Sequence, residues 1–319
     1  MLSDLKTSET HTKITMQQIV PAPIPSARAT STAIYVPLFY SEKVKNPGKA
    51  HFVKSVLLGH WVFGVVAWSC ISPHPVINAL SLLLLTVSYW CVYEIGYQEN
   101  DAIGDRYEAK PTLSSAYRQY ESRIDLNTPW PWCWAIGLAI PGCFLFALSQ
   151  WSISLNAMAA QLSSPDTDLV WSVVGGAAVR GVVIWLAYLV AIRVTFWIYN
   201  QANEAARIWI YPFLQLQRLF GFALLASTSA AGAMLLMAYS ISRWIQYCIY
   251  RCEGDRTRFP INVSCLLLFT LMYSSLALGT SDVMALVTVQ SAIAFIYCTL
   301  RASKKSRQLT ASLGWIKKD

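Results

Sequence analysis

Five carboxylates lie close together in the sequence: Glu94, Glu99, Asp101, Asp105 and Glu108. The charged fraction of the whole chain is only 13%. In a helix, Asp101, Asp105 and Glu108 follow at i, i+4 and i+7 and share one face. Like charges on one face repel, so the spacing favours a cation among them, and hard oxygen ligands suit Mg²⁺ carrying a substrate phosphate. A solvated acidic loop neutralised by Arg106 and Lys110 is the alternative.

The acidic stretch closes an apolar run that is long enough to cross a bilayer. Apolar residues make up 55% of the 319-residue chain, which contains 13 Trp and 16 Tyr and has a mean hydropathy of +0.40. This composition predicts an integral, multi-pass membrane protein. The net charge of +8 is explained by basic loops at the membrane edge, so no nucleic-acid partner is expected.

Runs of roughly 20 apolar residues mark the expected membrane crossings. We expect eight, near residues 55–73, 76–96, 131–150, 169–197, 209–226, 229–250, 261–279 and 283–300. The fold class is therefore an all-α, polytopic helical bundle. Its transmembrane domain covers residues 55–300, between a polar amino-terminal tail, 1–54, and a basic carboxy-terminal tail, 301–319.

The distribution of basic residues predicts the orientation of this bundle. Of the 25 Lys and Arg, 21 lie in the tails and in the loops that an inside amino terminus would place inside, and none lies in an outer connection. The positive-inside rule is thus satisfied with both termini in the cytoplasm. The acidic loops lie on the cytoplasmic side as well, at the cytoplasmic membrane if the source is bacterial.

Four arginines fall within the expected crossings: Arg180, Arg193, Arg218 and Arg243. Arg180 is about eleven residues into the fourth crossing, where an ionised side chain costs at least about 2.5 kcal/mol. It is therefore expected to face a cavity, a carboxylate or an anionic ligand. It could surround a diphosphate together with Lys110, Arg193, Arg207, Arg218 and Arg243. A second, weaker acidic loop after the sixth crossing carries Glu253 and Asp255.

The Asn100-Asp101 pair followed by Asp105 and Glu108 resembles the first aspartate-rich motif, NDxxDxxxD, of the UbiA superfamily of intramembrane prenyltransferases. The loop after the sixth crossing stands where that family carries its second motif, and the resemblance covers about 55–300. The spacing here is NDxxxDxxE, the second motif is reduced to two acids, and eight crossings are expected where the family usually has nine. The chain thus resembles a divergent member.

The resemblance implies that an isoprenyl diphosphate, or a related lipid substrate, binds through Mg²⁺ at the cytoplasmic side while the bundle encloses its tail. Asp101 and Asp105 are then the leading catalytic residues. The implied metal ligands are Asp101, Asp105, Glu108, Glu253 and Asp255, and the expected substrate-binding residues are Asn100, Lys110, Arg180, Arg193 and Arg207.

The expected activity is transfer of the prenyl group to an acceptor, with membrane lipids as the surroundings. A terpene cyclase of the same fold and a non-catalytic membrane protein or carrier are the alternatives. The prenyl chain length, the acceptor and the oligomeric state are left open by the sequence.

Overall fold

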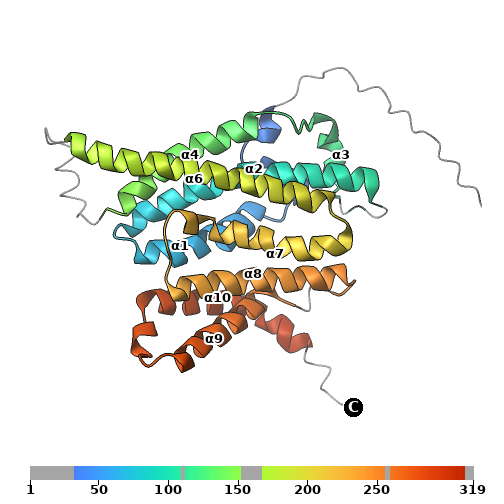
Figure 1. The fold of residues 1–319 in the computed structure, drawn as a ribbon. Helices are drawn as coiled ribbons and strands as arrows, with labels where there is room; N and C mark the ends of the chain where they lie inside the picture. The colour runs from blue at the N-terminus through green and yellow to red at the C-terminus, as the bar shows by residue number, and fades with distance from the viewer. Residues whose placement is uncertain (1–31, 109–110, 112, 152–166, 256–258, 313–319) are drawn as a thin grey trace, which may run out of the picture. The chain divides into compact units, whose positions relative to one another are not determined.

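The structure is a computed structural model that describes residues 32–108, 111, 113–151, 167–255 and 259–312. No strand forms among the described residues, which are mainly helical (Figure 1). The all-α class is therefore confirmed for this part of the chain.

A helical segment coincides with each of the expected crossings. The first consists of η3 (Phe52–Trp61), α1 (Val62–Trp68) and η4 (Ser69–Ile71); the others are α2 (Pro75–Tyr107), α4 (Trp130–Ser149), α6 (Thr167–Gln201), α7 (Glu204–Phe220) with η6 (Gly221–Leu224), α8 (Ala230–Arg251), α9 (Ile261–Gly279) and α10 (Val289–Ser312). Short helical turns complete the described chain: η1 (Thr32–Tyr35), η2 (Tyr40–Lys45), α3 (Tyr117–Tyr120), η5 (Glu121–Arg123) and η8 (Met284–Leu286).

Within the described residues, five helical segments are long and apolar enough to cross a membrane: Phe52–Ile71, Pro75–Tyr107, Trp130–Ser149, Ser172–Gln201 and Ile261–Gly279. Several crossings, and hence a membrane protein, are supported by these lengths and compositions.

The length of α2 explains how its carboxylates escape the apolar layer. Pro75 stands in its first turn, where its missing N–H costs no hydrogen bond. Its 33 residues span about 50 Å, whereas the hydrocarbon core of a bilayer is about 30 Å thick. The last turns of α2, the acidic end from Glu94 to Tyr107, can therefore extend beyond the hydrocarbon.

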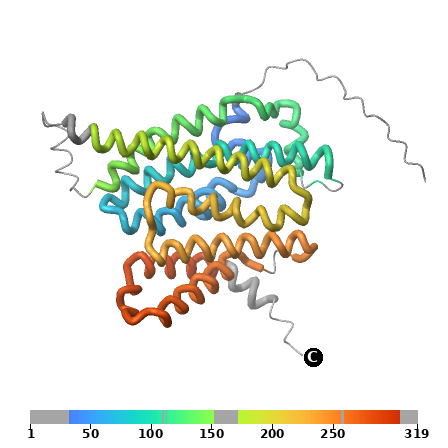
Figure 2. The backbone as a smooth tube through the Cα atoms, in the orientation of Figure 1, coloured from blue at the N-terminus to red at the C-terminus, as the bar shows by residue number. Residues whose placement is uncertain are grey.

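Helix α2 is central to the arrangement. It packs against α4 and α6, while α7 and α8 pack against each other and α9 packs against α8 and α10 (Figures 1 and 2). Small residues permit the close crossings. A Cβ atom on Gly142 of α4 would lie 2.8 Å from a Leu85 methyl group of α2, and one on Gly96 of α2 would overlap the Phe196 ring of α6.

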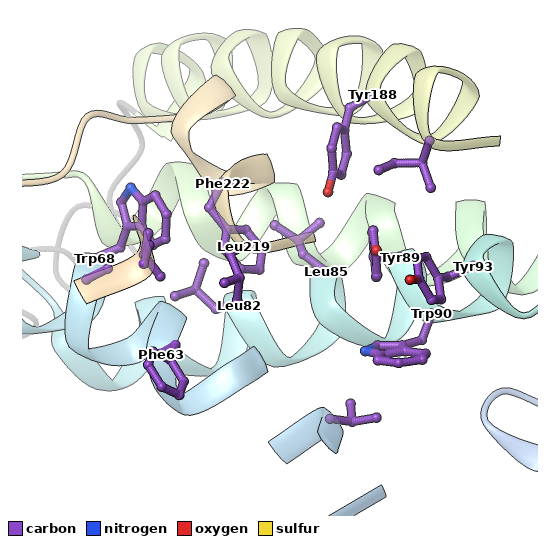
Figure 3. Close-up of a cluster of buried hydrophobic side chains, with 14 of the residues drawn as sticks. Phe63, Trp68, Leu82, Leu85, Tyr89, Trp90, Tyr93, Tyr188, Leu219 and Phe222 are labelled. Carbon is purple, nitrogen blue, oxygen red and sulfur yellow. The ribbon is translucent and has the colours of Figure 1, made fainter. Parts of the chain in front are cut away.

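Aromatic side chains fill much of the space between these helices. Tyr89, Trp90 and Tyr93 project from α2, Tyr188 reaches down from α6, and Phe222 enters from η6 (Figure 3). The Tyr89 and Tyr93 rings stack with their centroids 5.1 Å apart. Such pairs add to the burial of their large apolar area.

The amino-terminal segment 32–54 folds onto the acidic end of α2, whereas the sequence predicts that it belongs to a polar tail. Ile34, Tyr35, Tyr40 and Val44 are buried, and they form a second hydrophobic cluster with Tyr117. This packing is stabilised because it removes five aromatic and aliphatic side chains from water. Residues 34–44 therefore pack with the helical chain that follows; residues 1–31 lie outside the described part.

Candidate functional site

A polar pocket of 510 Å³ lies at the acidic end of α2. Its volume is within the range of small-molecule sites, about 300–1,000 Å³. Helix α2, the segment after η2, helix α8 and the start of α7 all contribute to its wall. Its charged residues are two carboxylates, Asp101 and Glu108, and four cations, Lys45, Lys49, Arg207 and Arg251. The excess of positive charge suits an anionic ligand.

Asp101 is the most enclosed carboxylate of the polar pocket, with a side chain only 3% exposed. One of its oxygens pairs with the Lys45 ammonium, and the Tyr40 hydroxyl donates to the other at 2.8 Å. Burial, followed by the charge of Asp101, raises the pKa of Tyr40, so this hydroxyl remains a donor. Asp101 is thus held in one orientation with one face towards the pocket.

Asp105 does not join Asp101, although it lies one helical turn further. Its carboxylate points to α3, where Arg118 donates two hydrogen bonds of 2.8 and 2.5 Å. Arg118 is 63% exposed and also pairs with Glu121. Asp105 is not among the residues that line the polar pocket. Asp101, Asp105 and Glu108 therefore do not line one pocket together: Asp105 is rotated only about 40° from Asp101 on α2, but Arg118 of α3 binds its carboxylate.

Glu108 lies just beyond α2, where the backbone has become extended. Its carboxylate accepts from the Arg207 guanidinium at 2.6 Å. Arg207 is 5% exposed, and its other nitrogens donate to the backbone carbonyls of Tyr199, Asn200 and Ala202. This buried, fully bonded arginine fixes the position of Glu108, and both line the polar pocket.

Glu99 and Arg193 form a second ion pair between α2 and α6, at 2.9 Å. The Asn200 amide donates to the same carboxylate oxygen at 2.9 Å and to the Gly96 carbonyl at 3.1 Å. Neither Glu99 nor Arg193 lines the polar pocket. The structure therefore assigns Arg193 to positioning α2 against α6 rather than to the pocket wall.

Tyrosines join Arg251 on the opposite wall of the polar pocket. The Arg251 Nε donates to the Tyr247 hydroxyl at 2.8 Å, and the Tyr247 and Tyr199 hydroxyls lie 2.8 Å apart. Tyr211 stacks on Tyr247 with ring centroids 4.0 Å apart. This rigid aromatic wall holds the guanidinium of Arg251 at the pocket surface.

The remaining predicted site residues lie elsewhere. Glu253 and Asp255 are exposed and do not line the polar pocket, to which the end of α8 contributes Arg251 instead. Arg180 is exposed, in a 150 Å³ crevice between α4 and α6, and it makes no ion pair among the described residues. Of its three expected surroundings, a cavity, a carboxylate or an anionic ligand, Arg180 thus faces a cavity, namely this crevice. Lys110 lies outside the described residues.

Sequence reasoning missed Lys45, Lys49 and Arg251 as pocket residues. The two lysines belong to a segment that the sequence assigns to a tail, and Arg251 is one of several arginines at a membrane edge. His51 lies near the positive charge of this pocket, and its Nδ1 is 3.2 Å from the side-chain nitrogen of Asn46. Burial, followed by the charges of Arg218, Arg243 and Lys49, lowers the pKa of His51 to about 4.

Asn100, Asp101 and Glu108 offer oxygen ligands on one side of the polar pocket. Among the described residues, no group of three or more His, Cys, Asp or Glu is placed to hold a metal ion. Mg²⁺ does not require such a group, because it is commonly bound by one or two carboxylates, with substrate phosphates and water completing its coordination. The pocket residues thus fit an ion that binds together with a phosphate ligand.

Comparison of the chain with protein-family models, curated proteins and solved structures finds no match. The fold and the site by themselves define a class: a helical protein of membrane type whose polar pocket is cationic and carries two carboxylates.

Proposed function

We propose that the chain is a UbiA-like intramembrane prenyltransferase that binds an isoprenyl diphosphate with Mg²⁺ in the polar pocket. One observation carries the proposal: Asn100, Asp101 and Glu108 line a single cavity together with Arg207 and Arg251. A diphosphate needs cations around its oxygens, and a magnesium ion bound to it needs one or two carboxylates. The pocket combines both requirements.

In the proposed reaction, the bond between the allylic carbon and the diphosphate oxygen breaks, and the diphosphate keeps the electron pair. The allylic carbon then bonds to a nucleophilic atom of the acceptor, which loses a proton. Arg207 and Arg251 stabilise the charge that develops on the leaving group, since fixed cations need no reorganisation. Bound Mg²⁺ would supply further positive charge there. Asp101 and Glu108 would hold it, with Asn100 in support.

The aromatic side chains beyond the polar pocket support an apolar, cation-forming substrate. Tyr97 lies next to the pocket, with the Lys45 ammonium 5.9 Å from its ring centroid. It contacts Tyr93 and Phe196, with ring centroids 5.0 and 5.8 Å away. Aromatic faces attract cations, so these rings suit an allylic carbocation and its tail.

The proposal includes eight crossings, with both termini and the polar pocket on the cytoplasmic side. Ser122, in the loop between α2 and α4, and Ser281, in the loop between α9 and α10, are both exposed. In a cysteine-free background, Ser281→Cys is expected to react with a membrane-impermeant maleimide in intact cells. Ser122→Cys should react only after permeabilisation. Reaction of both positions from the same side would contradict the eight-crossing arrangement.

The proposed activity is tested with the purified full chain in lipid nanodiscs and a non-hydrolysable farnesyl diphosphate analogue. We expect saturable binding that requires Mg²⁺ and disappears in a chelator, while farnesol, which lacks the diphosphate, does not compete. Product analysis with a prenyl diphosphate, with and without an aromatic acceptor, separates transfer from cyclisation. Binding that is absent, or indifferent to Mg²⁺, would refute the proposed function.

A further inference from the structure

Two arginines within the bundle, the interior arginine pair Arg218 and Arg243, lack the carboxylate partners that the other interior arginines have; Arg218 is buried and Arg243 is partly buried. Arg193 pairs with Glu99 and Arg207 with Glu108, whereas neither member of the pair forms a salt bridge among the described residues. The contrast marks the pair as positive charge that no carboxylate among the described residues neutralises.

Arg218 lies at the end of α7 and is 1% exposed. It is fourteen residues from the start of the helix, a rise of about 21 Å. One terminal nitrogen donates to the Ser55 carbonyl at 2.5 Å, and the guanidinium carbon lies 4.9 Å from the Trp90 ring centroid. Its Nε is buried and makes no hydrogen bond to any described residue.

Arg243 lies on the neighbouring helix α8, with its guanidinium carbon 6.0 Å from the ring centroid of Tyr239. Its Nε is also buried without a hydrogen-bond partner among the described residues. Tyr239 lies beside Arg218 as well: a Cβ atom built on Gly59 would be 3.0 Å from the Tyr239 hydroxyl and 3.7 Å from a terminal nitrogen of Arg218. The two guanidiniums therefore lie near the same tyrosine.

Other polar atoms around the pair are unsatisfied as well. The buried atoms without a hydrogen-bond partner in the described structure include His51 Nε2, His60 Nδ1, Tyr89 Oη and Trp90 Nε1. These rings adjoin one another: His60 and Tyr89 have centroids 5.1 Å apart, and those of His51 and Trp90 are 5.4 Å apart. Buried polar groups are normally hydrogen-bonded, so such a concentration indicates a missing polar partner.

The nearby carboxylates do not supply that partner. Glu94 accepts hydrogen bonds from the backbone N–H groups of Leu38 and Ser41 at 2.9 and 2.6 Å. Asp101 is bound by Lys45 and Tyr40, as described above. An arginine remains charged at any relevant pH, and each charge within a membrane costs at least about 2.5 kcal/mol, of which an aromatic face offsets only part.

We propose that Arg218 and Arg243 form an oxyanion site inside the bundle, which binds the carboxylate of a small molecule with an apolar body. The planar guanidinium fork matches a carboxylate, and the surrounding Trp90, Tyr89 and Tyr93 rings suit an apolar body. Neither arginine lines the polar pocket. Tyr97 and His51 lie between the arginine pair and the polar pocket, since they contact the pocket residues Lys45 and Asn46. The inference does not depend on prenyl transfer.

The experiment uses the full chain in phosphatidylcholine nanodiscs and measures the binding of radiolabelled benzoate and decanoate by equilibrium dialysis. Benzoate represents a free aromatic acid, and decanoate represents a lipid-derived acid. We expect saturable binding of at least one acid, with no competition from the matching neutral amide. Arg218→Gln and Arg243→Gln should each weaken binding at least tenfold. Arg180→Gln, which removes an exposed arginine, should bind as the native chain does.

Lysine variants separate a loss of ligand recognition from a loss of folding. Arg218→Lys and Arg243→Lys keep the positive charge but lose the fork, so affinity should follow the order native, Lys, Gln at either position. A bound acid should also raise the melting temperature of the native chain, but not that of the glutamine variants. The proposal is overturned if neither acid binds saturably, if the amides compete equally, or if the glutamine variants keep native affinity.

Discussion

Asp101→Asn is expected to lower the Mg²⁺-dependent affinity for a prenyl diphosphate analogue on the order of 100-fold, the usual effect of removing one partner of an enclosed charge interaction. The variant keeps an oxygen but loses the charge of the most enclosed carboxylate in the polar pocket. Titration of Mg²⁺ against analogue binding measures the effect. If this variant keeps native affinity, the carboxylates at the acidic end of α2 form structural ion pairs and do not bind the ligand.

Two neighbouring carboxylates provide matched controls. Asp105→Asn should leave binding nearly unchanged, because Asp105 is engaged by the exposed Arg118 away from the polar pocket. Glu121→Gln removes the other partner of Arg118 and should be equally harmless. A loss of affinity in Asp105→Asn as large as that in Asp101→Asn would mean that Asp105 turns towards the ligand when one is bound.

Lys45→Gln separates binding from stability at the same ion pair. Both Asp101→Asn and Lys45→Gln remove the pair and should lower the melting temperature, because each leaves a partly buried partner uncompensated. Only Asp101→Asn removes the carboxylate. Lys45→Gln should therefore retain Mg²⁺-dependent binding, although its contribution to diphosphate affinity is lost. Equal loss of Mg²⁺ dependence in both variants would assign the effect of Asp101→Asn to misfolding.

Gly96→Val is expected to destabilise the bundle by at least about 1–3 kcal/mol, the range for overpacking a core, and to reduce the yield of folded protein. A Cβ atom at this position would overlap the Phe196 ring of α6. The Gly96 carbonyl also accepts from Asn200 at 3.1 Å, so a displaced α2 would lose that contact too. Thermal unfolding and size-exclusion chromatography of the purified variant measure the effect.

Gly137→Val on α4 is the matched control, since no atom lies within 4 Å of a Cβ atom built there. It should melt close to the native chain, because nothing is overpacked and valine is a better helix former than glycine. Adding Phe196→Ala to Gly96→Val should recover part of the lost stability, because the overlapping ring is removed. A Gly96→Val chain that melts as the native chain does would show that α2 and α6 do not cross closely here.

Most of the helical architecture could be predicted from the sequence, because hydropathy and length are local properties. The expected crossing 261–279 coincides with α9, and 131–150 differs from α4 by one residue at either end. The small-residue break after Ser227 indeed separates α7 and η6 from α8. The limits of the amino-terminal segment were less predictable, since its burial depends on contacts with Tyr117 and the end of α2.

The site was only partly predictable, because a sequence does not fix the rotation of a helix about its axis. Asp101 and Glu108 face the polar pocket, but Asp105, between them, faces α3. Likewise, hydropathy singled out Arg180 by its depth, but only the packing of α6 against α4 decides that its side chain is exposed in a crevice.

The sequence by itself determined that this chain is helical, membrane-like in composition, and acidic at one end of α2. Only the tertiary structure decided the partners of those acids. Glu99 and Arg193 are 94 positions apart, and Glu108 and Arg207 are 99 apart. Such pairs depend on the packing of α2 against α6 and the start of α7. The same packing leaves Arg218 and Arg243 without a carboxylate among the described residues, because the acids that could neutralise them are held by other partners.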